Sequence, residues 1–126
     1  MTTNGEGLPH GRILLVEDDL QLRELVTTIL EEDGYTVIAV AAPADASAIL
    51  GHVTFDLVIT DGFSRTGAAT LVNAADVVRM AGVTPVALFT AHKLDPADAL
   101  KAGFRDLIVK PFDIDTLECQ VQALLR

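Results

Sequence analysis

Five short runs of consecutive apolar residues constrain the fold of this chain more than any other feature. They occupy residues 13–16, 37–40, 57–59, 86–89 and 107–109. A strand with one face in water alternates apolar and polar residues, whereas a strand covered on both faces is apolar at successive positions. The runs therefore predict parallel strands in a sheet that is covered on both sides.

An amphipathic stretch follows each run and predicts a helix. The first helix ends before Gly34, the second begins near Pro43, and the fourth spans about 96–102 and stops at Gly103. Five strand-then-helix units with right-handed crossovers predict an α/β fold, a doubly wound five-stranded parallel sheet with helices on both faces. The apolar stripes of the first, third and last helices are Leu22, Leu25, Val26, Ile29 and Leu30, then Leu71, Val72, Ala75, Val78 and Arg79, then Ile114, Leu117, Val121, Leu124 and Leu125.

The length and composition indicate one folded domain. The chain has 126 residues, of which 50% are hydrophobic, and its mean hydropathy is +0.40, which excludes disorder along the whole length. Residues 1–11 contain glycine and proline without apolar periodicity. We therefore predict a flexible tail over 1–11 and a single domain over 12–126.

The charge balance limits the possible partners. Acidic residues outnumber basic ones by 18 to 9, for a formal net charge of −9. Nucleic acids and anionic membranes are bound through clustered lysine and arginine, so we expect this domain to bind neither one directly. Metal cations and basic partners are the expected ligands.

Cysteine usage suggests the compartment. Cys119 is the single cysteine, so the chain cannot form an internal disulfide. No signal peptide or long apolar run is present, and we therefore expect a cytoplasmic protein. We also expect Cys119 to be a partly buried structural thiol.

The residues that directly follow the predicted strands are polar. In sheets of this kind, ligands bind beyond the carboxyl ends of the strands. We therefore expect these side chains to surround a single crevice. Four of the strands lead into Glu17-Asp18-Asp19, Asp61, Thr90 and Lys110-Pro111.

Each of these residues also has an ordinary structural explanation. Asp18 or Asp19 would cap the following helix, and Asp18 with Gln21 has the spacing of a capping box. Asp61 with Gly62 is a common turn sequence. A threonine at a strand end and a solvated lysine need no special role. The grouping, and not any single residue, points to a function.

Taken together, the residues indicate a metal and phosphate chemistry. Carboxylates that lie close together repel one another unless a cation lies among them. Oxygen ligands with few other protein donors suit Mg²⁺, which keeps several waters and favours phosphate as a further ligand. Lys110 and Thr90 supply a positive charge and a hydroxyl for phosphoryl oxygens. The set predicts Mg²⁺-assisted phosphoryl transfer to a carboxylate.

With these residues in this order, the chain resembles the receiver domains of two-component response regulators. The similarity covers about Arg12 to Arg126 and implies the flavodoxin-like (βα)5 receiver fold with strand order 2-1-3-4-5. The motifs that carry it are Ile-Leu-Leu-Val-Glu-Asp-Asp at 13–19, Asp61, Thr90-Ala91 and Lys110-Pro111-Phe112.

The resemblance implies a signalling switch. Asp61 would accept a phosphoryl group from a sensor histidine kinase or a phosphotransfer protein, and the domain would catalyse its own phosphorylation and dephosphorylation. It would form a homodimer through the fourth helix, fifth strand and fifth helix.

The resemblance also implies roles for the site residues. Thr90 and Lys110 would contact the phosphoryl oxygens, and the Lys110-Pro111 peptide is often cis in this family. The implied Mg²⁺ ligands are Asp18, Asp61, the backbone carbonyl of Phe63 and, through water, Glu17.

The chain departs from the family pattern at three places. The segment after Asp61 is about two residues shorter than usual and lacks Met-Pro, and it contains the Phe63 carbonyl. Leu107 stands at the switch position, where an aromatic residue normally changes rotamer on activation, so we expect weaker or different transmission of the signal. Phe104 occupies a position that is usually small, so we expect the turn after the fourth helix to bulge.

Three alternative functions remain open. A pseudo-receiver would keep the fold and dock partner proteins without phosphorylation; the altered loop and Leu107 favour it, and the intact acidic residues, threonine and lysine oppose it. A flavodoxin-like nucleotide or flavin binder needs a glycine- or serine-rich phosphate loop after the first strand, where this chain has Glu17-Asp18-Asp19. A phosphatase of the haloacid dehalogenase type needs a second aspartate two residues after the nucleophile, where this chain has Phe63.

Overall fold

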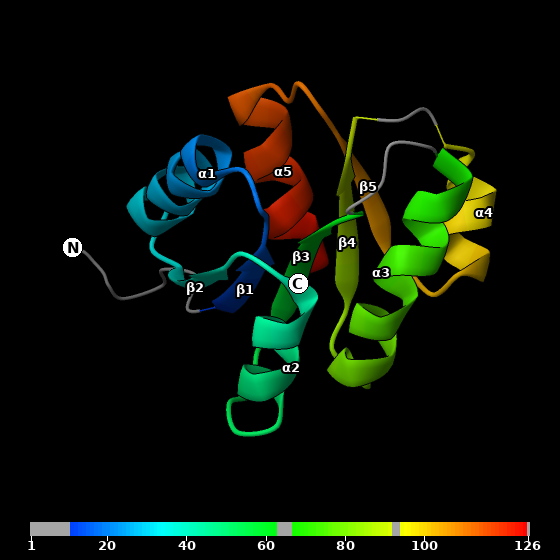
Figure 1. The fold of residues 1–126 in the computed structure, drawn as a ribbon. Coiled ribbons are helices and arrows are strands. Elements are labelled where there is room, and N and C mark those ends of the chain that lie inside the picture. Colours follow the sequence, from blue (N-terminus) through cyan, green and yellow to red (C-terminus); the bar gives the residue numbers. More distant parts are fainter. Residues whose placement is uncertain (1–10, 63–66, 92–93, 126) are drawn as a thin grey trace.

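The computed structural model describes residues 11–62, 67–91 and 94–125, with the backbone alone for 67–73. Strands and helices alternate along these residues (Figure 1). Every helix in this described part is too short or too polar to cross a lipid bilayer. In chain order the elements are β1 (Arg12–Val16), α1 (Leu20–Glu32), β2 (Thr36–Val40), α2 (Pro43–Leu50), β3 (Leu57–Asp61), α3 (Gly67–Ala81), β4 (Val86–Thr90), α4 (Pro96–Lys101), β5 (Asp106–Val109) and α5 (Ile114–Leu124).

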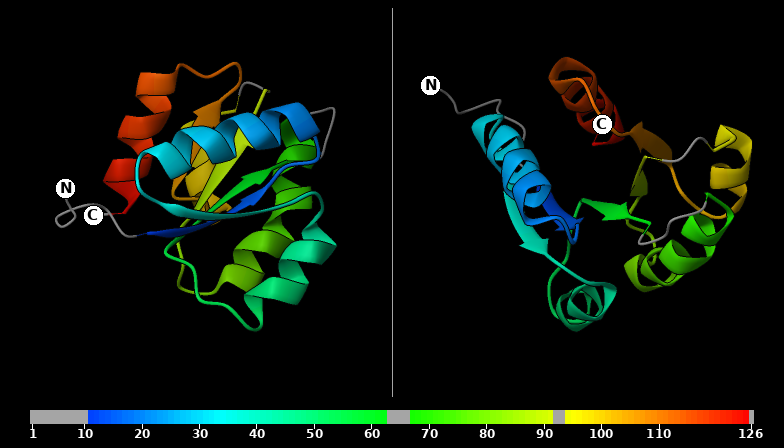
Figure 2. Two further views of the ribbon diagram at one scale, coloured as in Figure 1. Left: turned by 90° about the vertical axis from the view of Figure 1, so that its left-hand side faces the viewer. Right: turned by 45° about the horizontal axis from the view of Figure 1, so that its top comes forward.

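The strands form one parallel sheet in the order β2-β1-β3-β4-β5. Helices α1 and α5 cover one face, and α2, α3 and α4 cover the other (Figure 2). The predicted doubly wound sheet and its strand order are confirmed. The direction of winding reverses between β1 and β3, so the carboxyl ends of these two strands lie at the point where such folds bind ligands.

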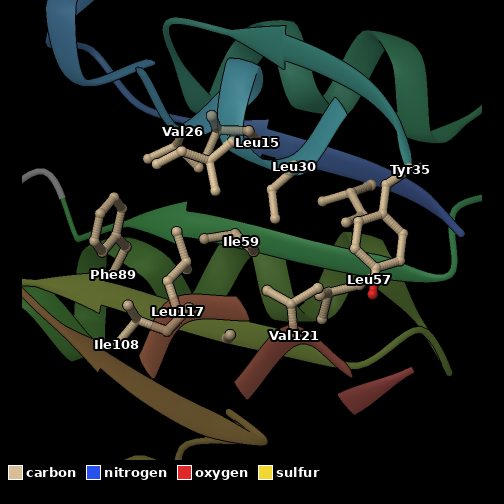
Figure 3. Close-up of a cluster of buried hydrophobic side chains, with 13 residues drawn as sticks. Leu15, Val26, Leu30, Tyr35, Leu57, Ile59, Phe89, Ile108, Leu117 and Val121 are labelled. Atoms are coloured by element: carbon tan, nitrogen blue, oxygen red, sulfur yellow. The ribbon is translucent and has the colours of Figure 1, made fainter. Parts of the chain in front are cut away.

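The central strands send alternate side chains to opposite faces of the sheet. In β1, Ile13 and Leu15 point toward α1 and α5, whereas Leu14 and Val16 point toward the other three helices. All four side chains are fully buried. Figure 3 shows the first of these two clusters, in which Leu15 lies with buried residues of α1 and α5. Burial on both faces is the reason for the consecutive apolar residues.

The two edge strands are less buried than their apolar sequences predict. In β2, Ala39 is exposed, and in β5, Val109 is 57% exposed. An edge strand has a neighbouring strand on one side only, so the helices that cover the sheet protect it less completely. The expectation of burial on both sides holds for the central strands β1, β3 and β4.

The buried face of α3 differs from the predicted stripe. Its fully or nearly fully buried residues are Ala74, Val77 and Ala81, while Ala75 and Val78 are half-buried. The observed face thus lies beside the predicted stripe: Arg79 is exposed, Val77 was left out, and the side chains of Leu71 and Val72 lie outside the described residues.

The single cysteine lies on the outer side of α5. Cys119 is exposed, so the prediction of a partly buried thiol is wrong. It is two positions from each of the buried residues Leu117 and Val121. Two positions correspond to about 200° around a helix axis, which turns the cysteine away from the core.

The residue before β1 takes part in the sheet. Gly11, which falls in the predicted tail, accepts a hydrogen bond from the Thr36 amide at 3.0 Å. Residues 1–10 of that tail lie outside the described part of the chain. The pairing of the first two strands therefore extends back by one residue from Arg12.

Candidate functional site

Acidic side chains meet at the carboxyl edge of the sheet. Glu17 and Asp18 follow β1, and Asp61 ends β3, which pairs with β1. One carboxylate oxygen from each of the three lies within 4.8 Å of the others. The fold thus brings together two segments that lie far apart in the sequence, as predicted from the strand ends.

Lys110 bridges two of these carboxylates from the end of β5. Its Nζ atom donates to Glu17 Oε1 at 2.8 Å and to Asp61 Oδ1 at 3.1 Å. Glu17 is 1% exposed and the lysine side chain 18%, so water screens this contact poorly. When all three acids are ionised, Lys110 compensates one of three negative charges.

The ammonium group of Lys110 also contacts an aromatic ring. Lys110 Nζ lies 4.8 Å from the ring centroid of Phe89, and this ring packs against Phe112 with centroids 5.6 Å apart. A cation over an aromatic face is attracted by the electrons of the ring. The Lys110-Pro111 peptide between these contacts is cis. The aromatic support limits the directions that the ammonium group can take.

In the loop from β1 to α1, Asp19 and not Asp18 caps the helix. The Asp19 side chain accepts a hydrogen bond from the Leu22 amide at 3.1 Å and is the N-cap of α1. The Asp19 amide in turn donates to Glu17 Oε2 at 3.1 Å. Capping is therefore the role of Asp19, and the exposed Asp18 side chain has no hydrogen bond to any described residue.

The remaining oxygen atoms fit a hard divalent cation. Both Glu17 carboxylate oxygens already accept hydrogen bonds, one from Lys110 and one from the Asp19 amide. Asp18 keeps both of its oxygens and Asp61 keeps Oδ2, as judged over the described residues. Mg²⁺ takes one or two carboxylates and keeps several waters. Asp18 and Asp61 are thus the residues that would hold it directly, with Glu17 reaching it through water.

Burial and charge set the protonation of the two most enclosed groups. Burial raises the pKa of the Glu17 carboxyl, and hydrogen bonds from Lys110 and the Asp19 amide offset this only in part. Burial alone would lower the pKa of Lys110, but its hydrogen bond to Glu17 and the charge of Asp61 outweigh burial, so the pKa is raised. Lys110 therefore keeps its proton, and a further cation would favour the ionised form of Glu17.

The other predicted site residues have different surroundings. Thr90 ends β4, is 2% exposed, and accepts a hydrogen bond at its carbonyl from the Lys110 amide at 2.8 Å. Its β4 neighbour Phe89 is paired with Asp61 in the sheet register, which puts Thr90 beside the acidic cluster. Phe63, with its predicted carbonyl ligand, lies outside the described residues.

Leu107, the predicted switch position, and Phe104 lie on the opposite face of the sheet from Phe89. Leu107 is half-buried and packs against the cluster under α2, α3 and α4, where Phe104 is 1% exposed. The turn after α4 does not bulge: the amides of Gly103 and Phe104 donate to the carbonyls of Leu100 and Ala99, each at 3.0 Å. The core beneath α4 accommodates the large ring, so the expected bulge is wrong.

Two features of the site were missed in the sequence. One is the aromatic pair Phe89 and Phe112, whose members read as ordinary apolar residues. The other is Arg23, whose Nη1 atom donates to the Glu17 carbonyl at 2.8 Å. A signal for Arg23 existed, because a cation in the first turn of a helix opposes the helix dipole and needs a local reason to be there.

Comparison with known proteins decides the family. Residues 13–122 match the response regulator receiver domain. The chain belongs to this family. PmrA, a response regulator of Pseudomonas aeruginosa, is 36% identical to it over 118 residues, covering 91% of this chain and 52% of PmrA. The transcriptional regulatory protein CpxR of Escherichia coli is 34% identical over 119 residues, covering 91% of this chain and 49% of CpxR.

The receiver domain thus spans about half the length of these curated relatives. Solved structures agree with its fold. A response regulator from Thermotoga maritima matches with a TM-score of 0.79 and 28% identity, over 93% of this chain and 98% of that one. The chemotaxis response regulator CheY4 of Vibrio cholerae matches with a TM-score of 0.77 at 24% identity, over 93% and 100% of the two chains, and supports the fold alone.

The free oxygens of Asp18 lead to a prediction about metal binding. Millimolar Mg²⁺ should raise the melting temperature of the wild-type receiver domain and scarcely change that of Asp18→Asn. Binding to the native state alone stabilises it by about 2.7 kcal/mol at a hundredfold excess over Kd. Thermal unfolding with Mg²⁺ or with EDTA measures the difference.

The matched control removes the same charge from α1, away from the loop that carries Asp18. Glu31→Gln changes an exposed carboxylate near the far end of this helix and should respond to Mg²⁺ like the wild type. Equal rises in all three proteins would show that the ion binds away from Asp18.

Proposed function

We propose that this receiver domain accepts a phosphoryl group on Asp61 from a histidine kinase or a phosphotransfer protein and acts as a signalling switch. One observation supports this more than any other. The Asp61 carboxylate lies against the Lys110 ammonium on one side and within the acidic cluster on the other, with Oδ2 unbonded among described residues. A nucleophilic oxygen therefore adjoins the positive charge that a phosphoryl group requires.

In the proposed transfer, Asp61 is the nucleophile, and Lys110 and Thr90 bind the phosphoryl oxygens. An Asp61 oxygen forms a bond to phosphorus as the phosphorus–nitrogen bond of phosphohistidine breaks; the electron pair stays on the imidazole nitrogen, which takes up a proton from water. Lys110, 3.1 Å from Asp61 Oδ1, turns to a phosphoryl oxygen as negative charge moves there. Thr90 donates its hydroxyl to another phosphoryl oxygen. Bound Mg²⁺ would reduce the repulsion between carboxylates and phosphoryl oxygens.

Loss of the phosphoryl group uses the same arrangement. A water molecule attacks phosphorus in line with the Asp61 oxygen, and the bond between this oxygen and phosphorus breaks. Inorganic phosphate leaves with the two protons of the water, and the Asp61 carboxylate returns to Lys110. The chain in this way catalyses both its phosphorylation and its dephosphorylation. We place this chemistry in the cytoplasm, without direct binding of nucleic acid by this domain. The surface through which two copies would pair is α4, β5 and α5, and weak coupling through Leu107 would keep this pairing weak on phosphorylation.

Intact mass spectrometry tests the acceptor. After incubation with acetyl phosphate and Mg²⁺, the wild type should gain about 80 Da, the mass of one phosphoryl group on a single acceptor. Asp61→Asn should gain nothing, because an amide oxygen is a poor nucleophile. Asp115→Asn removes an exposed carboxylate from α5 and should label like the wild type. Labelling of the Asp61→Asn variant at the wild-type level would refute the assignment.

Leu107 favours a second candidate function, a pseudo-receiver that docks partners without phosphorylation. Leucine fills less volume than an aromatic ring and has no polar edge that distinguishes a buried from an exposed position. In the proposed receiver, the coupling from Asp61 through Leu107 should therefore lie at the low end of the roughly 1 to 3 kcal/mol typical of linked sites.

Hydrogen exchange with and without beryllofluoride, a phosphoryl mimic, measures this coupling. Protection should increase around Asp61 and Thr90 and spread little into α5 (Ile114–Leu124). The variant Leu107→Tyr supplies a ring and should extend the protection toward α5. Strong new protection of α5 in the wild type would contradict weak coupling, and no change anywhere would favour the pseudo-receiver.

A further inference from the structure

Arg23 occupies an electrostatically unfavourable place. It is the fourth residue of α1, and the first turn of this helix contains no acidic residue that would pair with it. Backbone amides give the start of a helix a partial positive charge, so a guanidinium there is repelled. Among the ion pairs of the described residues, none involves Arg23. The acidic residues that precede the helix offset part of this repulsion, and a specific contact fixes where the side chain lies.

That contact lies in the loop that presents Asp18. The Arg23 Nη1 atom donates to the Glu17 carbonyl at 2.8 Å, and the Arg23 amide donates to the Asp19 carbonyl at 2.9 Å. These two carbonyls flank Asp18 on both sides. The second bond is the ordinary first hydrogen bond of the helix, which any non-proline residue makes at this position. The Arg23 side chain itself thus fixes the carbonyl directly before Asp18.

The other anchors of the loop leave the Asp18 side chain unsupported. The Glu17 amide donates to the Val40 carbonyl at 3.0 Å, and the Asp19 amide and side chain bind Glu17 and α1. The Asp18 carboxylate itself is exposed and makes no hydrogen bond within the described residues. Its direction therefore depends on the backbone on either side of it.

We infer that Arg23 is a positioning residue that holds the backbone around Asp18 so that its carboxylate faces a cation shared with Asp61. The inference rests on the proposed function, since Mg²⁺ is the cation concerned. Arg23 bonds to a carbonyl and takes up no carboxylate oxygen, so it orients the site without competing for its ligands. Groups that orient metal ligands in this way typically contribute a factor of about 10 to 100 in affinity.

Two physical effects of replacing Arg23 have opposite signs. Removal of a positive charge near an acidic cluster should strengthen the binding of a cation if charge were the only effect. Loss of the hydrogen bond to the Glu17 carbonyl should weaken binding, because Asp18 is then less well oriented. The direction of the change in Mg²⁺ affinity therefore separates positioning from electrostatics.

Isothermal titration calorimetry with Mg²⁺ alone tests the inference. Arg23→Met should raise the Kd by about 10-fold, and Arg23→Gln, with its shorter side chain, should change it in the same direction. Arg79→Met removes an exposed arginine from the last turn of α3 and should leave the Kd unchanged. Circular dichroism in EDTA verifies that each variant is folded.

The outcomes distinguish this inference from the proposed function. If the wild type binds no Mg²⁺, the proposed function fails. If the wild type binds Mg²⁺ and the folded Arg23 variants bind it equally or more tightly, the positioning role of Arg23 is refuted while the proposed function stands.

Discussion

Lys110 places one positive charge between the carboxylates of Glu17 and Asp61, at 2.8 and 3.1 Å. Without this charge, three carboxylates within 4.8 Å of one another would repel, and water screens the repulsion poorly at Glu17 and Asp61, which are 1% and 17% exposed. The pair also joins the end of β5 to the ends of β1 and β3. Because one lysine compensates only one of three charges, the same arrangement that stabilises the site leaves it ready for a divalent cation.

The central part of the fold was predictable because its physical cause is visible in the sequence. A strand covered on both faces must be apolar at successive positions, and Ile13 to Val16 meet that condition. The exposure of Val109 was missed because an apolar run alone does not reveal whether its strand lies at an edge, although the strand order implied by the resemblance places the fifth strand there. The exposure of Cys119 was missed because a thiol beside the apolar stripe does not reveal how far it lies from the core. The buried face of α3 was missed because apolar residues lie on several sides of this helix, so spacing alone does not select one face.

Some features of the candidate site were likewise predictable from the sequence, and others were not. The fold rule that polar residues after parallel strands converge was enough to group Glu17, Asp18, Asp61 and Lys110. The sequence did not decide whether Asp18 or its neighbour caps α1, because both have suitable side chains, and the structure assigns the cap to the neighbour. The contact of Arg23 with the Glu17 carbonyl depends on the reach of one side chain, which spacing alone does not determine.

A crystal structure of the chain with Mg²⁺ and beryllofluoride tests the account most directly, because it shows the acceptor, the metal ligands and the lysine together. The account predicts beryllium bonded to an Asp61 oxygen, the metal in contact with Asp18 and Asp61, and Lys110 Nζ moved from Asp61 to a fluoride. Beryllium absent from Asp61, with Lys110 still bridging Glu17 and Asp61, would contradict it.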